Sequence, residues 1–108
     1  MTSVIVRYKT RPDRGDENQR LIENVFAELA RSKPAGLHYA SFRLADGVSF
    51  MHVSMVDGDG PNPLSQSAAF AEFQREIAAR CVEQPLAQDA VLVGSFGFLD
   101  TAVPERTA

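Results

Sequence analysis

The feature that most constrains the fold of this chain is a short turn between two strand-like runs. Residues 35–44 and 48–56 have the composition of strands, and Ala45-Asp46-Gly47 lies between them. An Asp-Gly pair flanked by such runs is a strong signal for a β-hairpin. If Asp46 and Gly47 form a two-residue turn, the numbers of facing residues sum to about 93, which places His52 opposite Ser41.

The hairpin predicts two sheet faces of different chemistry, because successive side chains of a strand point to opposite faces. One face is wholly apolar and is expected to lie beneath helices; it comprises Ala40, Phe42, Leu44, Met51, Val53 and Met55. The other face mixes polar and aromatic side chains; it comprises Tyr39, Ser41, Arg43, Phe50, His52 and Ser54. His52 is therefore predicted on the polar face and not in the core.

The first strand is expected over residues 3–9, a short run rich in β-branched side chains. Its alternation predicts that Val4, Val6 and Tyr8 pack under the helices. Arg7 then falls on the polar face, with His52. A further strand is expected over residues 90–99, with Ser95 on the polar face.

Two amphipathic helices separate these strands. The first follows Asp16, whose spacing to Gln19 matches a capping box, and it ends near Lys33. The second follows Ser65 or Ser67 as the N-cap. Their apolar faces, at helical spacing, comprise Leu21, Ile22, Val25, Phe26 and Leu29 in the first helix and Phe70, Phe73, Ile77 and Cys81 in the second, with Pro85 beyond its end.

The order strand, helix, strand, strand, helix, strand predicts a ferredoxin-like βαββαβ sandwich of the α+β class, with both helices on one face of an antiparallel sheet. Residues 1–100 are expected to form this single domain, and residues 101–108 a C-terminal tail. The other face of the sheet lacks a covering layer. We expect it to pack against a second copy of the chain, giving a homodimer through the sheet face.

Composition excludes several classes of function. The net charge is -3, the pI is about 5.3 and no basic run occurs, which argues against nucleic-acid binding. No apolar stretch approaches the length of a membrane span, and the first residues do not resemble a signal peptide. The single cysteine, Cys81, excludes an intramolecular disulfide framework and fits a reducing compartment, so a cytoplasmic location is expected.

The best chemical cluster is His52 with Tyr39, Ser41, Arg7 and Arg43. A neutral imidazole could take a proton from a phenol or an activated C–H bond. An arginine could hold the anion that results, and Tyr39 could donate to an oxygen while its ring packs on a planar substrate. The alternative is that these side chains only satisfy one another across a dimer interface, since polar cross-strand pairs commonly stabilise sheets.

Metal sites are not expected. Two histidines and one cysteine on three separate elements show no zinc-ligand spacing. The run that begins at Asp57 resembles a calcium loop, but Asn62 stands where the turn glycine is needed and Ala68 where the closing glutamate is needed. This run is better interpreted as a connection that could cover the mouth of a pocket.

Three stretches, residues 33–43, 50–56 and 65–78, resemble the antibiotic biosynthesis monooxygenase-like family of the dimeric α+β barrel superfamily. They match a Pro-Gly-containing entry to the second strand, the third strand, and a second helix in which a serine precedes two phenylalanines three residues apart. The resemblance implies a homodimer. Characterised relatives oxygenate phenolic or quinone-type molecules without metal or flavin, and others degrade haem, isomerise lactones or have no known activity. The expected enzyme is therefore a cofactor-independent monooxygenase or a related isomerase, and no cofactor is expected.

The sequence therefore predicts a small-molecule site on the polar face. The expected catalytic residues are His52, Arg7 and Tyr39, and the expected substrate-binding residues are Ser41, Arg43, Phe50 and Ser54. The alternative function is a non-catalytic dimeric module, like the stress-responsive α+β barrel proteins that the layout also resembles. A cavity of about 300 Å³ or more would favour the small-molecule site.

Overall fold

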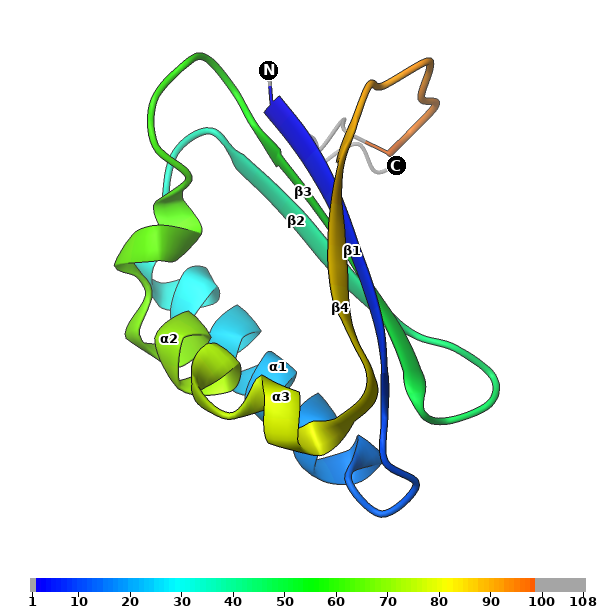
Figure 1. Cartoon of the computed structure of the whole chain (residues 1–108). Helices are drawn as coiled ribbons and strands as arrows, with labels where there is room; N and C mark the ends of the chain where they lie inside the picture. Colours follow the sequence, from blue (N-terminus) through cyan, green and yellow to red (C-terminus); the bar gives the residue numbers. More distant parts are fainter. Residues whose placement is uncertain (1, 99–108) are drawn as a thin grey trace.

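The computed structural model describes residues 2–98, which form one antiparallel sheet with helices on one of its faces (Figure 1). The strands are β1 (Thr2–Thr10), β2 (Leu37–Arg43), β3 (Ser49–Val56) and β4 (Cys81–Ala90), in the spatial order β2-β3-β1-β4. The helices are α1 (Gly15–Ser32), α2 (Ala68–Arg75) and α3 (Ile77–Arg80), and a short 3-10 helix, η1 (Pro63–Gln66), precedes α2. The predicted ferredoxin-like α+β fold is confirmed. None of the helices within residues 2–98 is both long and apolar enough to span a membrane.

The hairpin of β2 and β3 has the predicted register, with Ser41 facing His52. Its loop is four residues long and not two, because the last cross-strand bond runs from the Leu44 amide to the Ser49 carbonyl (2.8 Å). The carboxylate of Asp46 stabilises this loop by accepting bonds from the Ser49 hydroxyl (2.5 Å) and amide (2.8 Å). These bonds lower the pKa of Asp46 to about 2.

The structure reverses the predicted assignment of the two sheet faces. β1 pairs with β3 so that Val6 faces His52 and Tyr8 faces Phe50, and facing residues of an antiparallel pair project to the same side. The helices cover this side, where His52 is 5% exposed and Phe50 is 2% exposed. The mixed polar and aromatic face of the hairpin is thus the inner face. The apolar set lies on the outer face, where Phe42 is 44% exposed.

The alternation within β1, β2 and β3 was nevertheless predicted correctly. In β1, Val6 and Tyr8 contact the hydrophobic core, as expected. Arg7 was predicted beside His52, and this was wrong, because Arg7 faces Met51 and Leu86 on the outer side. A polar inner face is possible because its buried polar groups are hydrogen-bonded, which offsets the cost of removing them from water.

The last strand lies earlier in the chain than predicted. β4 begins at Cys81, which the helical pattern assigned to the second helix, and it ends at Ala90, where the strand was expected to begin. Pro85 lies within β4, an edge strand of the sheet, and an edge strand tolerates a residue without a backbone N–H. Residues 91–98 form no helix or strand. Residue 99 and the predicted tail lie outside the described residues.

The core fills the space between the helices and the inner face, and its buried members are Tyr8, Ile22, Val25, Phe50, Leu64, Phe73 and Cys81. Helix α2 is capped by Ser67, one of the two predicted candidates, whose hydroxyl accepts a bond from the Phe70 amide (2.9 Å). Helix α1 begins at Gly15, so Asp16 lies in its first turn and does not cap it. A Cβ at Gly15 would lie 2.7 Å from the Gly47 carbonyl oxygen, so glycine allows α1 to approach the hairpin loop.

Candidate functional site

A pocket of about 690 Å³ lies between the inner face of the sheet and the segment from η1 to α3. The side chains that define its chemistry are Tyr8, Tyr39, His52, Ser54, Phe70 and Phe73. The connection between β3 and α2, which was predicted to cover a pocket mouth, contributes Asn62, Leu64 and Ser65 to the lining. Among the described residues no Asp, Glu, Lys or Arg lines this pocket. It is therefore an uncharged site with aromatic walls and several hydroxyl groups.

His52 lies at the centre of the polar side of this pocket. Its Nε2 is 2.7 Å from the Tyr8 hydroxyl. Its Nδ1 is 2.6 Å from the Ser41 hydroxyl and 3.0 Å from that of Tyr39. Burial lowers the pKa of His52 to about 4, so the imidazole is neutral at pH 7. A neutral imidazole has one donor and one acceptor nitrogen, and both nitrogens are already engaged by side chains of the same chain.

A chain of buried hydrogen bonds leads from Arg80 to Nε2 of His52. The Nε of Arg80 donates to Asn18 Oδ1 (3.1 Å), and the Asn18 amide nitrogen donates to the Tyr8 hydroxyl (2.8 Å). The Tyr8 hydroxyl therefore accepts a hydrogen bond from Asn18, and its own hydrogen can point toward Nε2 of His52. The Tyr8 hydroxyl could also accept from His52, but this row of donors favours the tautomer in which Nε2 accepts and Nδ1 carries the hydrogen toward the hydroxyls of β2.

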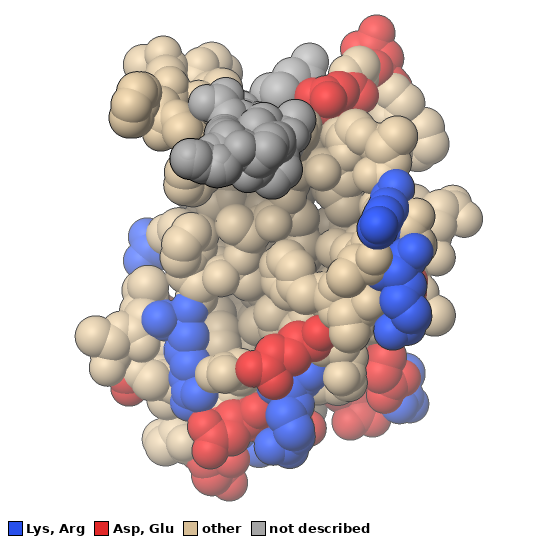
Figure 2. Space-filling view, turned by 180° about the vertical axis from the view of Figure 1, so that it is seen from behind, with Lys and Arg blue, Asp and Glu red and all other residues tan. Residues whose placement is uncertain are grey.

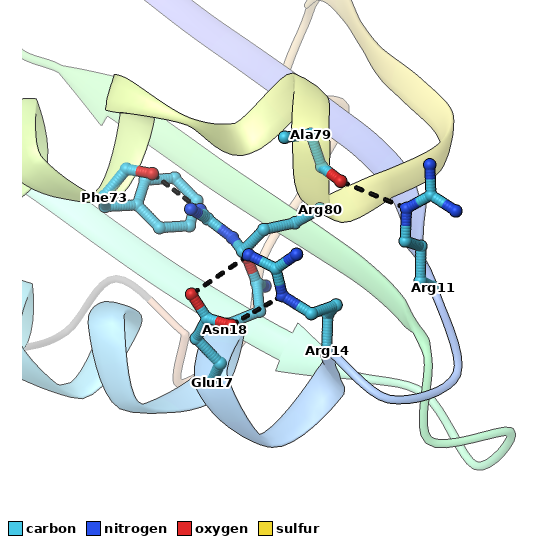
Figure 3. Close-up of polar contacts among 7 residues, drawn as sticks. All are labelled: Arg11, Arg14, Glu17, Asn18, Phe73, Ala79 and Arg80. Atoms are coloured by element: carbon cyan, nitrogen blue, oxygen red, sulfur yellow. Dashed lines mark hydrogen bonds and ion pairs between the residues drawn. The ribbon is translucent and has the colours of Figure 1, made fainter.

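Arg80 anchors the far end of this chain. It is 2% exposed, its Nη2 donates to the Phe73 carbonyl (2.6 Å), and its guanidinium carbon lies 5.4 Å from the centre of the Phe73 ring. Figure 3 shows the side chain reaching from the end of α3 toward Phe73 and Asn18, next to the Arg14–Glu17 ion pair of α1. Because a guanidinium stays protonated in proteins, Arg80 supplies a fixed positive charge behind the pocket.

The two tyrosines of the site stay protonated at neutral pH. Burial raises the pKa of Tyr8, and the bond from Asn18 and the charge of Arg80 oppose that effect. Burial also raises the pKa of Tyr39, while the Ser41 hydroxyl opposes it. The Tyr39 ring is further fixed by stacking on Phe26 of α1, with ring centres 5.1 Å apart. Both hydroxyls are therefore available as proton donors at positions that packing holds.

Three of the seven predicted site residues line this pocket, and a fourth, Ser41, contacts one of them. Tyr39, Ser41 and His52 form one hydrogen-bonded group, and Ser54 lines the pocket beside them. Ser41 itself lies behind His52, where it also borders a smaller hollow next to α1. The predicted pairing of His52 with Ser41 and Tyr39 is thus present, although on the inner face of the sheet and not on the outer one.

The other three predicted site residues lie elsewhere. Phe50 is buried in the core, stacked on Tyr8 with ring centres 5.5 Å apart. Arg43 borders the separate hollow of about 300 Å³ beside α1, and its side chain donates to Gln19 Oε1 (2.8 Å). Arg7 points to the outer face. The arginines that were expected to hold an anion beside His52 are therefore both remote from it.

Sequence reasoning missed three members of the site, namely Tyr8, Asn18 and Arg80. Tyr8 was placed correctly on the inner side of β1, but His52 was assigned to the opposite face. Asn18 lies four residues before Ile22, on the buried side of α1, and Arg80 lies seven residues after the buried Phe73. A polar residue at a buried helical position was the available signal in both cases.

Metal ligation has no evident place in this arrangement. Within residues 2–98 no group of three or more His, Cys, Asp or Glu side chains is placed to hold a metal ion. Cys81 is a free and buried thiol at the start of β4, and burial raises its pKa. The chemistry of the pocket thus resides in hydroxyl, imidazole and aromatic groups.

No protein-family model matches this sequence, and neither does any curated protein sequence. Solved structures do match. The chain is similar to a protein from Nitrosomonas europaea that carries the provisional name antibiotic biosynthesis monooxygenase, with a TM-score of 0.71 and 12% identity over 87% of this chain and 100% of that one. A Caulobacter crescentus protein with the same provisional name gives a TM-score of 0.64 and 16% identity, covering 86% of this chain and 90% of that one.

Rv0793 from Mycobacterium tuberculosis gives a TM-score of 0.67 and 13% identity over 87% of this chain and 96% of that one. These matches extend over nearly the whole of each chain, so the domain fold is shared from end to end. At this level of identity they show the fold alone.

Proposed function

We propose that this chain belongs to the antibiotic biosynthesis monooxygenase-like family and acts, without a cofactor, as a monooxygenase on a small planar phenolic or quinone-type molecule. The observation that carries the proposal is the uncharged pocket of about 690 Å³ in which Tyr8, Tyr39 and His52 meet aromatic walls. Its volume falls within the range of roughly 300–1,000 Å³ that is usual for small-molecule sites. The names of two structural neighbours support the reaction class.

The lining favours a neutral aromatic ligand. Phe70 and Phe73 offer ring faces, and aromatic pairs gain from stacked or edge-to-face contact. Hydroxyl groups of Tyr39 and Ser54 can donate to or accept from phenolic and carbonyl oxygens. A ligand with a formal charge would lose its water without gaining an ion-pair partner from the described lining, which is costly.

In such a reaction the substrate itself supplies the electrons. In the keto form of a phenolic ring, a CH₂ group and O₂ become a C=O group and water, so one oxygen atom enters the product and the other leaves as water. The first step is removal of a proton, which leaves an electron-rich anion that can react with O₂. We assign this step to Tyr8 and His52: the Tyr8 oxygen takes a proton from the ligand while its own proton passes to Nε2 of His52 along the hydrogen bond between them, in which oxygen and nitrogen are 2.7 Å apart.

The low pKa of the buried His52 opposes this transfer, but a bound anion next to the imidazolium would favour it. Tyr39 has a second role in this proposal. Its hydroxyl lines the pocket and contacts Nδ1 of His52 (3.0 Å). It would therefore orient a ligand oxygen by a hydrogen bond and stabilise the imidazolium. Ser41 holds the other side of Nδ1.

The proposal is tested with menadiol as the probe, using O₂ consumption for turnover and thermal shift for binding. A ligand present at about 100 times its Kd should stabilise the protein by roughly 2.7 kcal/mol. Phe70→Trp should narrow the pocket and weaken both signals, whereas Phe42→Trp, the same change on the outer face, should preserve them. Equal binding by the two variants would show that menadiol does not bind in this pocket.

Tyr8→Phe separates catalysis from binding. It keeps the ring that packs on Phe50 and removes the hydroxyl that bridges to His52. Turnover should fall by a factor on the order of 10² while the binding signal persists. An unchanged rate in this variant would remove Tyr8 from the proton path.

One observation favours the second candidate, a non-catalytic dimeric module. Both nitrogens of His52 are bonded within the chain, so the histidine is fully satisfied with no ligand present. A module of this kind binds menadiol weakly or not at all. It shows no O₂ consumption above the uncatalysed rate, even where a ligand binds.

We further propose that the chain forms a homodimer through the outer face of the sheet. That face carries Ala40, Met51 and Val53 of the hairpin, with Phe42 44% exposed and Leu86 of β4 62% exposed. In Figure 2 the centre of the side seen from behind is mostly tan, while the Lys, Arg, Asp and Glu atoms in view lie mainly toward its sides and its lower part. A contiguous apolar patch rimmed by charge is typical of an interface.

The cytoplasm is the proposed location. The support is that the one cysteine of the sequence, Cys81, is a free thiol. A chain with no second cysteine cannot form an internal disulfide, which fits the reducing cytoplasm. Fractionation of cells that express the full chain tests this proposal. Recovery of the protein outside the soluble cytoplasmic fraction would contradict it.

A further inference from the structure

The pocket on the inner face has two ends of different polarity. On the side of β2 and β3 it is lined by imidazole and hydroxyl groups, which belong to Tyr39, His52 and Ser54. On the side of β1, α3 and β4 its lining is aliphatic, with Val6, Ile77 and Pro85. The strand order β2-β3-β1-β4 separates the two groups across the sheet. We call the part lined by Val6, Ile77 and Pro85 the aliphatic end.

A β-bulge places Pro85 at the aliphatic end. The pairing of β1 with β4 shifts next to Tyr8, so that this one residue faces two, Gln84 and Pro85. Bulges of this kind redirect side chains and are common beside active sites. Pro85 is half-buried, whereas its neighbours on both sides, Gln84 and Leu86, are exposed. Because proline has no N–H, the bulge presents no unpaired backbone donor to the pocket at this position.

The same bulge is fastened to α3. The side-chain amide of Gln84 donates to the carbonyl of Ala78 (3.1 Å), and Ala78 directly follows Ile77 in the chain. This bond therefore holds Pro85 against the turn of helix that carries Ile77. Figure 1 shows α3 running directly into β4, which lies beside β1. The aliphatic end is thus built from three elements that contacts within the chain hold together.

We propose that the aliphatic end binds O₂ and holds it beside a ligand whose oxygens bond to the polar end. This inference rests on the proposed oxygenase function and adds a site for the second substrate of that reaction. O₂ is a small apolar molecule, and dry apolar cavities take up such guests: a cavity of about 150 Å³ binds benzene or xenon. A pocket of about 690 Å³ therefore has room for a fused-ring ligand and O₂ together.

Tyr8 borders both ends of the pocket. It faces Pro85 across the bulge, and its hydroxyl is 2.7 Å from Nε2 of His52. O₂ at the aliphatic end would thus lie near the ligand carbon that Tyr8 deprotonates. An aliphatic lining also excludes water from the reacting atoms.

The position of O₂ fits the remaining steps of the reaction. O₂ forms a C–O bond with the deprotonated carbon, using the electron pair of the anion. The peroxide that results takes back the proton held by His52. Its O–O bond then breaks, and hydroxide leaves with the second proton of that carbon as water, which yields the C=O group.

The first test uses O₂ itself as the probe, on the wild-type chain without a ligand. O₂ is paramagnetic, so it accelerates the NMR relaxation of the methyl groups that it contacts. The acceleration should be larger for the methyl groups of Val6 and Ile77 than for two controls. Val25 is 1% exposed and is not among the lining residues of the pocket, and Val82 is 53% exposed. Equal acceleration at Val6, Ile77 and Val25 would overturn the proposal, because O₂ would then dissolve in the whole apolar interior.

Menadione, the oxidised form of menadiol, tests whether the ring of the ligand occupies the aliphatic end instead. The acceleration at Val6 and Ile77 should persist when menadione is bound, as measured by thermal shift. Its loss on binding would overturn the proposal, since the ring would then exclude O₂. A chain that binds no menadione contradicts the proposed function alone, because the O₂ measurement needs no ligand.

A substitution at Val6 connects binding to turnover. Val6→Thr exchanges one methyl group for a hydroxyl of similar size, which favours a water molecule in place of O₂. The value of kcat/KM for O₂ should fall by about 10-fold, while the KM for menadiol stays the same. Val82→Thr, the same change at an exposed position of β4, should keep the wild-type values.

The two measurements separate the possible failures. An unchanged kcat/KM for O₂ in Val6→Thr, or a rise in the KM for menadiol alone, would overturn the proposal. A wild-type chain without turnover would overturn the oxygenase function, and the relaxation of the Val6 and Ile77 methyl groups would still decide whether O₂ binds there. That relaxation measurement also decides the matter if Val6→Thr fails to fold.

Discussion

The buried imidazole of His52 predicts a specific loss of stability in acid. Its pKa is about 4 in the folded chain, against 6.5 for an ordinary histidine. Between these two values the unfolded chain binds a proton that the folded chain does not, so the free energy of unfolding falls as the pH falls through this window. At about 1.36 kcal/mol for each pKa unit, this single group should remove about 3 kcal/mol between pH 7 and pH 4.

The neighbours of His52 do not add to this loss, because Tyr8 and Tyr39 are neutral throughout the window and their pKa values are raised by burial. Carboxylates with lowered pKa values, such as those of Glu17 and Glu72, lose their stabilising contribution as they protonate at lower pH. Their contribution is the same in any variant of His52. It therefore cancels when two chains are compared at each pH.

The measurement is urea unfolding of the wild-type chain and of His52→Gln at several pH values. The variant should be less stable at pH 7, and the gap between the two chains should narrow by about 3 kcal/mol as the pH falls to 4. His38→Gln is the matched control, since it removes a histidine outside the buried network, and it should keep the wild-type loss. A gap that is constant with pH, or an NMR titration of His52 near 6.5, would refute this reasoning.

Three further predictions concern the residues that position the site, each measured by urea unfolding at pH 7. Arg80→Met should lower the free energy of unfolding by about 3 kcal/mol, because it leaves the buried Asn18 oxygen without its donor. An NMR spectrum of the His52 ring nitrogens should also show a change of tautomer. The same tautomer in the variant would mean that Arg80 does not influence His52. Ser67→Ala should cost about 1 kcal/mol through loss of the α2 cap, whereas Ser67→Thr should not. Gly15→Ala should cost about 1–3 kcal/mol, since the new Cβ would crowd the hairpin loop; a neutral effect would show that the loop moves freely.

Local sequence signals determined the hairpin and the alternation within its strands. The Asp46-Gly47 turn sets the register in which Ser41 faces His52, because side-chain alternation and a short loop leave few other pairings. The same signals gave the inward side of β1 and the order of elements, and from these the ferredoxin-like fold. Alternation along the strands was also enough to group Tyr39, Ser41 and His52 on one face.

Which face of the hairpin lies under the helices was decided only by the tertiary structure. Either face could be buried: the apolar one against a partner, the polar one if every hydrogen bond is satisfied. The hydroxyls that bond to His52 come from β1 and β2. The hydrogen-bond chain behind Tyr8 comes from Asn18 of α1 and Arg80 of α3, which are 62 positions apart in the sequence.

No local pattern encodes a contact of that range. Pro85 was a second misleading local signal, because a proline suggests a break between elements. Only the sheet order shows that it lies inside β4, an edge strand in which the missing N–H costs little. The sequence alone thus determined which side chains share a face. The packing of distant segments determined that this face is the inner one, and that His52 lies in a pocket instead of on the outer surface.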